Sequence, residues 1–207
     1  MKELISRFDG VKVGLPLLLR EGPDLLRKVA ETAGERLRIA DFKLADIGDV
    51  MASSLEAIKA LGYDAVIAHA FTGKRGGLEV LRSKARELDV KVILVTSMSH
   101  EGSREFYDRH FREFLELAKE LEVWGVVVPA TRPQLVSEAR SVLGSNLRIL
   151  SPGVGVQGAG FGSALCSGAD YEIVGRSVLR SDRPVETAER ILSEIKEVVS
   201  TCRTSSA

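Results

Sequence analysis

The amino-acid sequence predicts an α/β protein of the (β/α)₈ TIM-barrel class whose first strand is missing from the given chain. Short apolar runs alternate with amphipathic segments along the 207 residues, which is typical of parallel strands covered by helices. Polar residues follow the carboxyl ends of several strands, and the last two strand–helix loops are rich in glycine, as in barrels that bind phosphate there. An open Rossmann sheet is the alternative, but no GxGxxG motif follows the first strand.

The individual elements follow from this alternation. Residues 2–8 have the pattern of half a helix that leads into the first strand. Apolar, β-branched runs predict seven strands, at Val11–Leu17, Leu37–Phe42, Ala65–Ala70, Lys91–Thr96, Gly125–Pro129, Leu147–Ser151 and Glu172–Gly175. Apolar residues at helical spacing predict helices at Asp24–Ala33, Met51–Leu61, Leu78–Leu88, Ser103–Leu121, Gln134–Leu143 and Glu186–Val199. Because no linker or change of composition interrupts the pattern, we expect one domain over residues 1–207, with a short flexible tail from about residue 201.

Charge and composition exclude several classes of protein. Lys and Arg number 29 and so do Asp and Glu, and a net charge of zero argues against a nucleic-acid binder or a protein held on a membrane by basic residues. No apolar run reaches the roughly 18–20 residues of a membrane span, and the N-terminus lacks the apolar core of a signal peptide. The two cysteines, Cys166 and Cys202, show neither a disulfide framework nor metal-ligand spacing, so we expect a reducing cytoplasm.

The most informative motif is a D-x-K-x-x-D pattern at the end of the second predicted strand. Side chains alternate along a strand, so Asp41 and Lys43 project on the same side, and Asp46 follows near the head of the next helix. A lysine between two carboxylates is kept protonated and oriented, which suits proton transfer. Lys12 lies in the preceding strand and can reach the same end of the sheet. A solvated ladder of salt bridges is the alternative, which the apolar strand around the motif disfavours.

Three further strand ends carry residues suited to binding a phosphorylated ligand. One strand ends in the hydroxyl-rich segment 96–102, the next but one is followed by Ser-Pro-Gly-Val-Gly-Val-Gln-Gly at 151–158, and the last leads into Gly175 and Arg176. Glycines let backbone N–H groups approach an anion, and an arginine beside them makes a paired contact with phosphate. His69 also ends a strand, but no partner stands at metal-ligand spacing, so we interpret it as structural and expect no metal.

Together these motifs resemble the orotidine 5'-monophosphate decarboxylase family. The resemblance rests on DFKLADI at 41–47, SMSHEG at 97–102, SPGVGVQG at 151–158, IVGRS at 173–177 and VKVGLPL around Lys12, and it extends from about Val11 to the C-terminal helix. It implies a (β/α)₈ barrel that acts as a homodimer, uses no metal or organic cofactor, and makes UMP from orotidine 5'-phosphate.

The resemblance also implies roles for individual residues. Lys43 is similar to the acid that protonates C6 of the pyrimidine as carbon dioxide leaves, Asp41 to the group against the substrate carboxylate, and Lys12 to the residue that completes the charged array. Asp46 and Ile47 correspond to residues that reach the partner's site in the dimer. The expected contacts with the pyrimidine, the base edge and the 5'-phosphate come from Ser99, Pro152, Gly153, Val154, Gly155, Gln157, Gly175 and Arg176.

The sequence departs from the family pattern in two places. Family members begin with a strand that ends in a catalytic aspartate. We expect this strand to be missing from the given chain, together with half a helix, which is roughly twenty residues by typical element lengths. Val50 stands where the family has a threonine that contacts the ribose. These departures leave open a weakly active, nucleotide-binding homologue. A magnesium-dependent sugar-phosphate decarboxylase or aldolase of the same superfamily is the other alternative, because such enzymes also carry D-x-K-x-x-D and Gly48 resembles their version of it.

Overall fold

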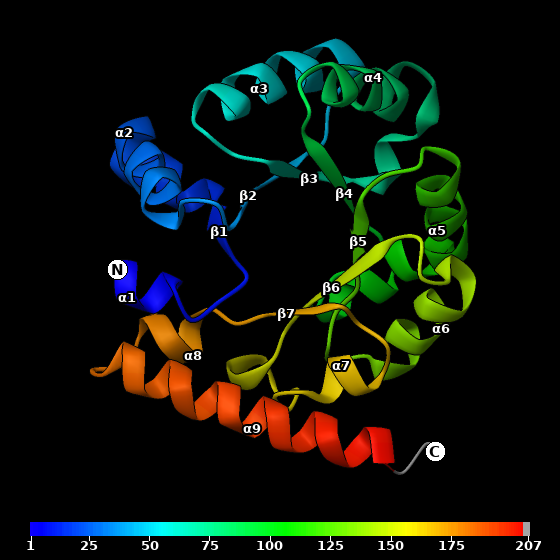
Figure 1. Ribbon diagram of the computed structural model, residues 1–207. Coiled ribbons are helices and arrows are strands. Elements are labelled where there is room, and N and C mark those ends of the chain that lie inside the picture. Colours follow the sequence, from blue (N-terminus) through cyan, green and yellow to red (C-terminus); the bar gives the residue numbers. More distant parts are fainter. Residues whose placement is uncertain (205–207) are drawn as a thin grey trace. The chain divides into compact units, whose positions relative to one another are not determined.

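The computed structural model describes residues 1–204, apart from the side chain of Arg203. Two compact units are present: Met1–Val95 together with Glu120–Trp124, and Thr96–Lys119 together with the described residues from Gly125 onward. Each unit contains parallel strands that alternate with helices along the chain (Figure 1). The interpretation of residues 1–207 as a single domain stays a prediction.

The first unit is a parallel sheet with helices packed on it. Its strands pair in chain order and are β1 (Gly10–Gly14), β2 (Leu37–Leu44), β3 (Ala65–His69) and β4 (Lys91–Val95). Its helical elements are α1 (Lys2–Ile5), α2 (Leu15–Ala33), α3 (Gly48–Ala60), the short η1 (Ala70–Thr72) and η2 (Lys74–Leu78), and α4 (Glu79–Glu87). Helices α2, α3 and α4 lie on one face of the sheet (Figure 1). The fully buried side chains of these strands and helices include Leu26, Leu55, Val66, Ile67 and Leu81.

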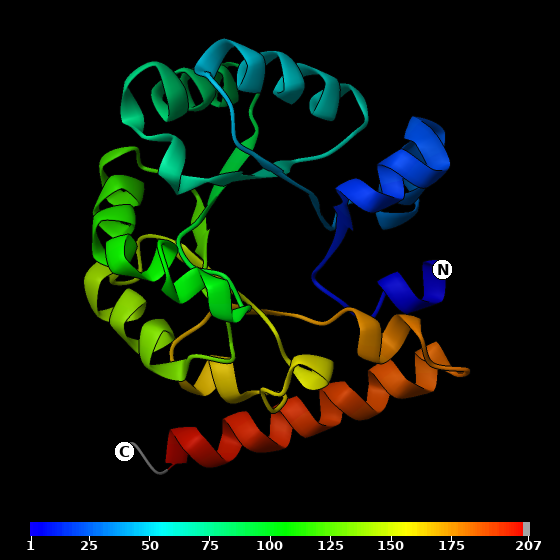
Figure 2. The ribbon, with the colours of Figure 1, turned by 180° about the vertical axis from the view of Figure 1, so that it is seen from behind.

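The second unit contains three parallel strands, β5 (Gly125–Val127), β6 (Arg148–Pro152) and β7 (Tyr171–Ile173). Its helices are α5 (Phe111–Glu120), whose last residue belongs to the first unit, α6 (Pro133–Leu143), α7 (Ser163–Cys166), α8 (Arg176–Leu179) and α9 (Pro184–Thr204). The short turns are η3 (Glu101–Arg104), η4 (Tyr107–His110) and η5 (Gly155–Gln157). Helix α9 runs along α7 and α8 (Figure 2). The carboxyl ends of β6 and β7 continue into the loops that carry the polar motifs, the glycine-rich loop after β6 and Gly175–Arg176 after β7.

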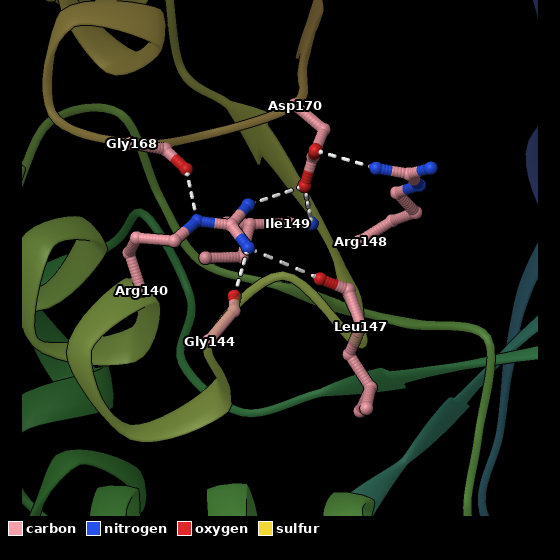
Figure 3. Close-up of polar contacts among 7 residues, drawn as sticks. All are labelled: Arg140, Gly144, Leu147, Arg148, Ile149, Gly168 and Asp170. Carbon is pink, nitrogen blue, oxygen red and sulfur yellow. Dashed lines mark hydrogen bonds and ion pairs between the residues drawn. The ribbon is translucent and has the colours of Figure 1, made fainter.

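Arg140 joins α6 to β6 and β7 in the second unit (Figure 3). Its Nη2 lies 2.5 Å from an Asp170 carboxylate oxygen, and its Nε donates to the Gly168 carbonyl at 2.8 Å. The same Asp170 accepts from the Ile149 backbone N–H at 2.8 Å and from Arg148 at 3.1 Å. Asp170, just before β7, is therefore joined to α6 and β6 by a network of charged hydrogen bonds.

The boundaries of several elements differ from the sequence-based prediction. Residues 15–17 are the first turn of α2 and not the end of a strand, because Pro16 fits the first turn of a helix, where its missing N–H costs nothing. Gly22 and Pro23 interrupt α2, which explains why the amphipathic pattern became clear only at Asp24. Strand β2 continues to Leu44 and so includes Lys43. The regular part of the predicted helix 103–121 begins only at Phe111, after the turns η3 and η4.

The prediction that the cysteines form no disulfide framework is wrong. Cys166 and Cys202 are bonded to each other across a sequence separation of 36 residues, with Cα atoms 5.9 Å apart. Such a pair cannot be recognised from spacing, since only the packing of α7 against α9 brings the two residues together. Residue 201, where we expected a flexible tail, lies within α9, and residues 205–207 lie outside the described residues. Among the helices that are described, none is both long and apolar enough to cross a membrane.

Candidate active site

Lys12, Asp41 and Lys43 form a charged trio in the first unit. The Asp41 carboxylate lies between the two ammonium groups, with Oδ2 2.8 Å from Lys12 Nζ and Oδ1 2.7 Å from Lys43 Nζ. Parallel pairing of Gly14 with Asp41 places Lys12 on the same face of the sheet as Asp41. The Asp41 side chain is only 10% exposed, whereas that of Lys43 is 40% exposed. The trio therefore presents an ammonium group to solvent above a largely buried carboxylate.

Asp41 and Lys43 lie where the pairing of β2 with β3 is irregular. Ala40 pairs with Val66 and Leu44 with Ala68, so β2 advances by four residues while β3 advances by two. Lys43, within the irregularity, has φ of 47°. A residue with a side chain is strained there by on the order of 1–3 kcal/mol, and such strain persists where the surroundings hold the residue in place. The ion pair with Asp41 and the strand pairing on either side provide that hold.

The charges of the trio keep Asp41 ionised. Burial raises the pKa of the Asp41 carboxyl, but Lys12 and then Lys43 lower it more, and the resulting pKa lies below its ordinary value. The Asp41 carboxyl group is therefore ionised at neutral pH.

His69 belongs to the surroundings of the trio, which the sequence interpretation did not foresee. It ends β3, and its pKa is lowered by burial and by the Lys43 charge, against a smaller opposite effect of Asp41. The imidazole is therefore neutral at pH 7. Its ring lies 5.0 Å from that of Phe71, centroid to centroid. Its position at the carboxyl end of the strand beside β2 could have indicated from the sequence that His69 lies near the trio.

Asp46 and Ile47 lie beyond the strand that carries the trio. Asp46 is exposed and accepts a hydrogen bond from the backbone N–H of Ile47 at 2.7 Å. Ile47 precedes the first residue of α3 and is 65% exposed, and Val50 on the same helix is 45% exposed. The structure thus brings Lys12, Asp41 and Lys43 together. Among the described residues, Asp46 makes no ion pair with Lys12 or Lys43, and the apolar side chains of Ile47 and Val50 near it are exposed.

The glycine-rich loop in the second unit is a tight backbone structure between β6 and α7. Gly153, Gly155 and Gly158 all have positive φ, which residues with side chains avoid. The Gly155 N–H donates to the Ala159 carbonyl at 2.8 Å, and the Ala159 N–H donates to the Gly153 carbonyl at 3.3 Å. Buried Val154 anchors the loop in a small apolar cluster, and Pro152 ends β6 opposite Ile173.

Two polar residues meet at this loop. Gln157 Nε2 donates to Ser99 Oγ at 3.1 Å, and Gln157 is exposed while Ser99 is half-buried. The sequence placed these residues in separate motifs, and the fold of the second unit brings them together.

Gly175 and Arg176 follow β7 and begin α8. The Arg176 guanidinium is exposed and makes no hydrogen bond or ion pair with another residue in the described range. A Cβ on Gly155 would lie 2.4 Å from Ser177 Oγ, so the glycine loop packs directly on the start of α8. Backbone N–H groups of a glycine turn next to an arginine form an arrangement that binds phosphate.

Arg132 is a second residue that the sequence interpretation missed. It is 5% exposed, pairs with Asp108, donates to Ser97 Oγ at 3.2 Å and donates to the His100 carbonyl at 2.9 Å. These contacts hold the loop that carries Ser99. Its sequence context, before Pro133, indicated only a helix start, so its charge was not recognised as structural.

Comparison with known proteins identifies relatives over most of the chain. Residues 1–191 match the family described as Orotidine 5'-phosphate decarboxylase / HUMPS family. The orotidine 5'-phosphate decarboxylase of Aeropyrum pernix is 47% identical over 188 residues, which are 90% of this chain and 76% of that protein. That of Methanococcoides burtonii is 40% identical, with 93% of this chain and 88% of that protein covered.

Solved structures are similar as well. The crystal structure of orotidine 5'-monophosphate decarboxylase from Sulfolobus solfataricus matches with a TM-score of 0.89 at 35% identity, covering 96% of this chain and 91% of that one. The Methanocaldococcus jannaschii enzyme, in complex with the inhibitor BMP, matches with a TM-score of 0.85 at 32% identity, covering 94% of this chain and 89% of that one.

Proposed function

The chain belongs to the orotidine 5'-phosphate decarboxylase family, and from that premise we propose that the trio of Lys12, Asp41 and Lys43 is its chemical centre. The resemblance noted in the sequence and the (β/α)₈ barrel fold class are confirmed by the relatives. The function is that of a carboxy-lyase, which converts orotidine 5'-phosphate to UMP in pyrimidine biosynthesis. The relatives named above all carry this activity in their names, so neither the sugar-phosphate alternative nor a weakly active binding homologue gains support.

The ion pairs of the trio are the observation that supports this centre. Loss of carbon dioxide breaks the C6–carboxyl bond and leaves its electron pair on C6 of the pyrimidine. A cation next to that carbon stabilises the developing charge more than it stabilises the substrate, so it lowers the barrier. Lys43, held by Asp41 at 2.7 Å, delivers its proton to C6 and regains one from solvent. Asp41 lies against the departing carboxylate, and Lys12 fixes Asp41 and contacts the ribose.

The glycine-rich loop and the start of α8 form the proposed phosphate site. Backbone N–H groups of the loop and the exposed Arg176 guanidinium bind the 5'-phosphate, with Gln157 and Gly175 beside them. Ser99 donates to the pyrimidine. The base packs along the loop residues Pro152, Gly153, Val154 and Gly155. Binding energy from this remote phosphate is then available to drive the reaction at C6.

We propose further that the enzyme is a homodimer whose sites are completed across the interface. The exposed, apolar Ile47 and Val50 beside the charged Asp46 support this proposal, because such a surface is typical of a contact with a second copy. Val50 cannot make the hydrogen bond of a threonine, so we assign the partner's ribose contact to Asp46. We place the protein in the cytoplasm, where its nucleotide substrate and product are used.

Replacement of Lys43 tests the chemical centre. Lys43→Met keeps the length of the side chain and removes the proton source and the cation, so turnover should fall by about 10²–10⁴ or more, the usual contribution of general acid catalysis. UMP binding should persist, since the phosphate contacts are untouched. The matched control is Lys59→Met, which removes a partly exposed lysine of α3 in the same unit and should leave turnover unchanged. Decarboxylation by Lys43→Met at a rate near wild type would eliminate Lys43 as the acid.

Subunit mixing tests the dimer. Asp46→Asn and Lys43→Ala proteins are each expected to be impaired, but a heterodimer regains one site with both residues intact. Activity should therefore recover when the two are mixed and subunit exchange is verified by native mass spectrometry. Verified exchange without recovery would refute a shared site.

A further inference from the structure

Glu172 is a half-buried carboxylate that bonds to the backbone of a neighbouring segment. It lies on β7 between Tyr171 and Ile173. Its Oε2 accepts the Gly162 N–H at 2.8 Å, and its Oε1 accepts the Ala164 N–H at 2.9 Å. Each carboxylate oxygen therefore accepts one hydrogen bond from a backbone N–H group, at the point where the glycine-rich loop enters α7.

Among the described residues, Glu172 has no ion-pair partner that would account for a carboxylate at this position, since none of the Lys or Arg side chains forms an ion pair with it. Burial raises the pKa of Glu172, against smaller opposite effects of the N–H groups of Gly162, Ala164 and Leu165. Removing a carboxylate from water without a cation beside it costs free energy. Hydrogen bonds from backbone N–H groups to the carboxylate offset part of this cost. What the carboxylate holds is the backbone of the loop.

The segment that Glu172 holds is the end of the proposed phosphate loop. Gly162 has φ of 84°, and a Cβ there would lie 2.9 Å from the Val198 side chain on α9, so the chain passes close to that helix. Phe161, one residue earlier, packs on the small apolar cluster that also includes Val154. The loop thus has an anchored beginning at Val154 and an anchored end at Gly162.

The strand that carries Glu172 also leads to Arg176, the arginine of the proposed phosphate site. β7 ends at Ile173, and the chain continues through Gly175 into Arg176 at the start of α8. Gly155 of the loop approaches the same helix start, because a Cβ there would lie 2.4 Å from Ser177 Oγ. A shift of the loop end relative to β7 therefore changes the distance between the loop N–H groups and the Arg176 guanidinium.

We propose that Glu172 is a positioning residue for the substrate phosphate: its carboxylate fixes the end of the glycine-rich loop to the strand that presents Arg176. This inference rests on the proposed phosphate site. Glu172 touches no substrate itself. It orders the backbone donors before the substrate arrives, so that less of the phosphate binding energy is spent on arranging the loop.

The test compares Glu172→Gln with a matched carboxylate on the same segment. Gln has one oxygen, so its amide NH₂ must face one of the two backbone N–H groups and leave it unsatisfied. We expect the KM for orotidine 5'-phosphate and the inhibition constant of UMP to rise on the order of tenfold, the effect of one unsatisfied buried donor. The kcat should stay within about threefold, as should kcat/KM for phosphate-free orotidine, because the Lys43 end of the site is untouched.

Asp170→Asn is the control. It also removes a carboxylate that accepts a backbone N–H, but its partners are the Ile149 N–H, Arg140 and Arg148, none of which belongs to the glycine-rich loop. It should lower the melting temperature without a selective change in phosphate-dependent KM. Glu172→Asp, which keeps the charge and shortens the side chain, should show a smaller rise in KM with the same selectivity, and it carries the test if Glu172→Gln does not fold.

Arg176→Ala separates failure of the inference from failure of the proposed site. If Arg176→Ala weakens orotidine 5'-phosphate and orotidine equally, the phosphate site is misassigned and the inference falls with it. The inference alone is overturned if Arg176→Ala weakens orotidine 5'-phosphate more than orotidine but the Glu172 variants weaken both equally. It is also overturned if Asp170→Asn raises the KM for orotidine 5'-phosphate as selectively as the Glu172 variants do. Phosphate-selective loss in the Arg176 and Glu172 variants, absent in Asp170→Asn, supports it.

Discussion

Removal of the Cys166–Cys202 disulfide should lower the stability of the second unit substantially. The bond joins the end of α7 to the last turns of α9 across 36 residues, a segment that contains β7, α8 and most of α9. The double variant Cys166→Ser, Cys202→Ser opens this loop and leaves the surrounding sequence unchanged. Serine is close to cysteine in size, so little packing is lost.

The size of the effect follows from the length of the closed loop. In the chain-entropy treatment, the denatured chain loses about 2.1 + 1.5R ln n cal/mol/K on cross-linking. A separation of 36 residues then corresponds to about 4 kcal/mol at 25 °C. For a protein of this size, each kcal/mol shifts the melting temperature by roughly 2–4 °C, so the expected decrease is roughly 8–15 °C.

Calorimetry of four samples measures this difference: wild type and double variant, each with and without a thiol reductant. Reductant should lower the melting temperature of the wild type to that of the double variant and should not change the variant. The kcat at 25 °C should remain close to wild type, because neither cysteine touches the proposed site. Two titratable thiols in unreduced wild type, or a decrease below about 2 °C, would refute the reasoning.

Three further predictions concern single residues. Gly155→Ala forces an alanine to a φ of 70° with its Cβ 2.4 Å from Ser177 Oγ, so it should cost at least about 1–2 kcal/mol in urea unfolding and raise the KM for orotidine 5'-phosphate. Asp41 has a lowered pKa, so its ion pairs are complete above its unfolded pKa of 3.8 and are lost as the pH falls through the lower folded value. Asp41→Asn should therefore flatten the acid limb of a plot of melting temperature against pH, and an unchanged limb would contradict this. Arg140→Ala removes the contacts in Figure 3 and should destabilise by about 2–3 kcal/mol in urea unfolding, whereas an effect below 1 kcal/mol would mean that Asp170 finds other partners.

The sequence predicted local structure well and misplaced boundaries where a special residue intervened. The alternation of strands and helices was visible because side-chain periodicity is a local property. The start of α2 at Leu15 was missed because Leu15-Pro16-Leu17 has the same apolar character as a strand end. The irregularity at Lys43 was invisible because it arises from the pairing of β2 with β3.

By itself, the sequence determined the family, the motif that carries Asp41 and Lys43, and the glycine-rich loop with Arg176, since each depends on residues close together in the chain. Only the tertiary structure decided which distant residues join them. Lys12 reaches Asp41 through the register of β1 on β2, and Gln157 meets Ser99 through the fold of the second unit. The partners of Arg132, of Glu172 and of both cysteines were likewise set by strand pairing and helix packing. Contacts of this kind join residues that no sequence period relates, so they become visible only once the chain is folded.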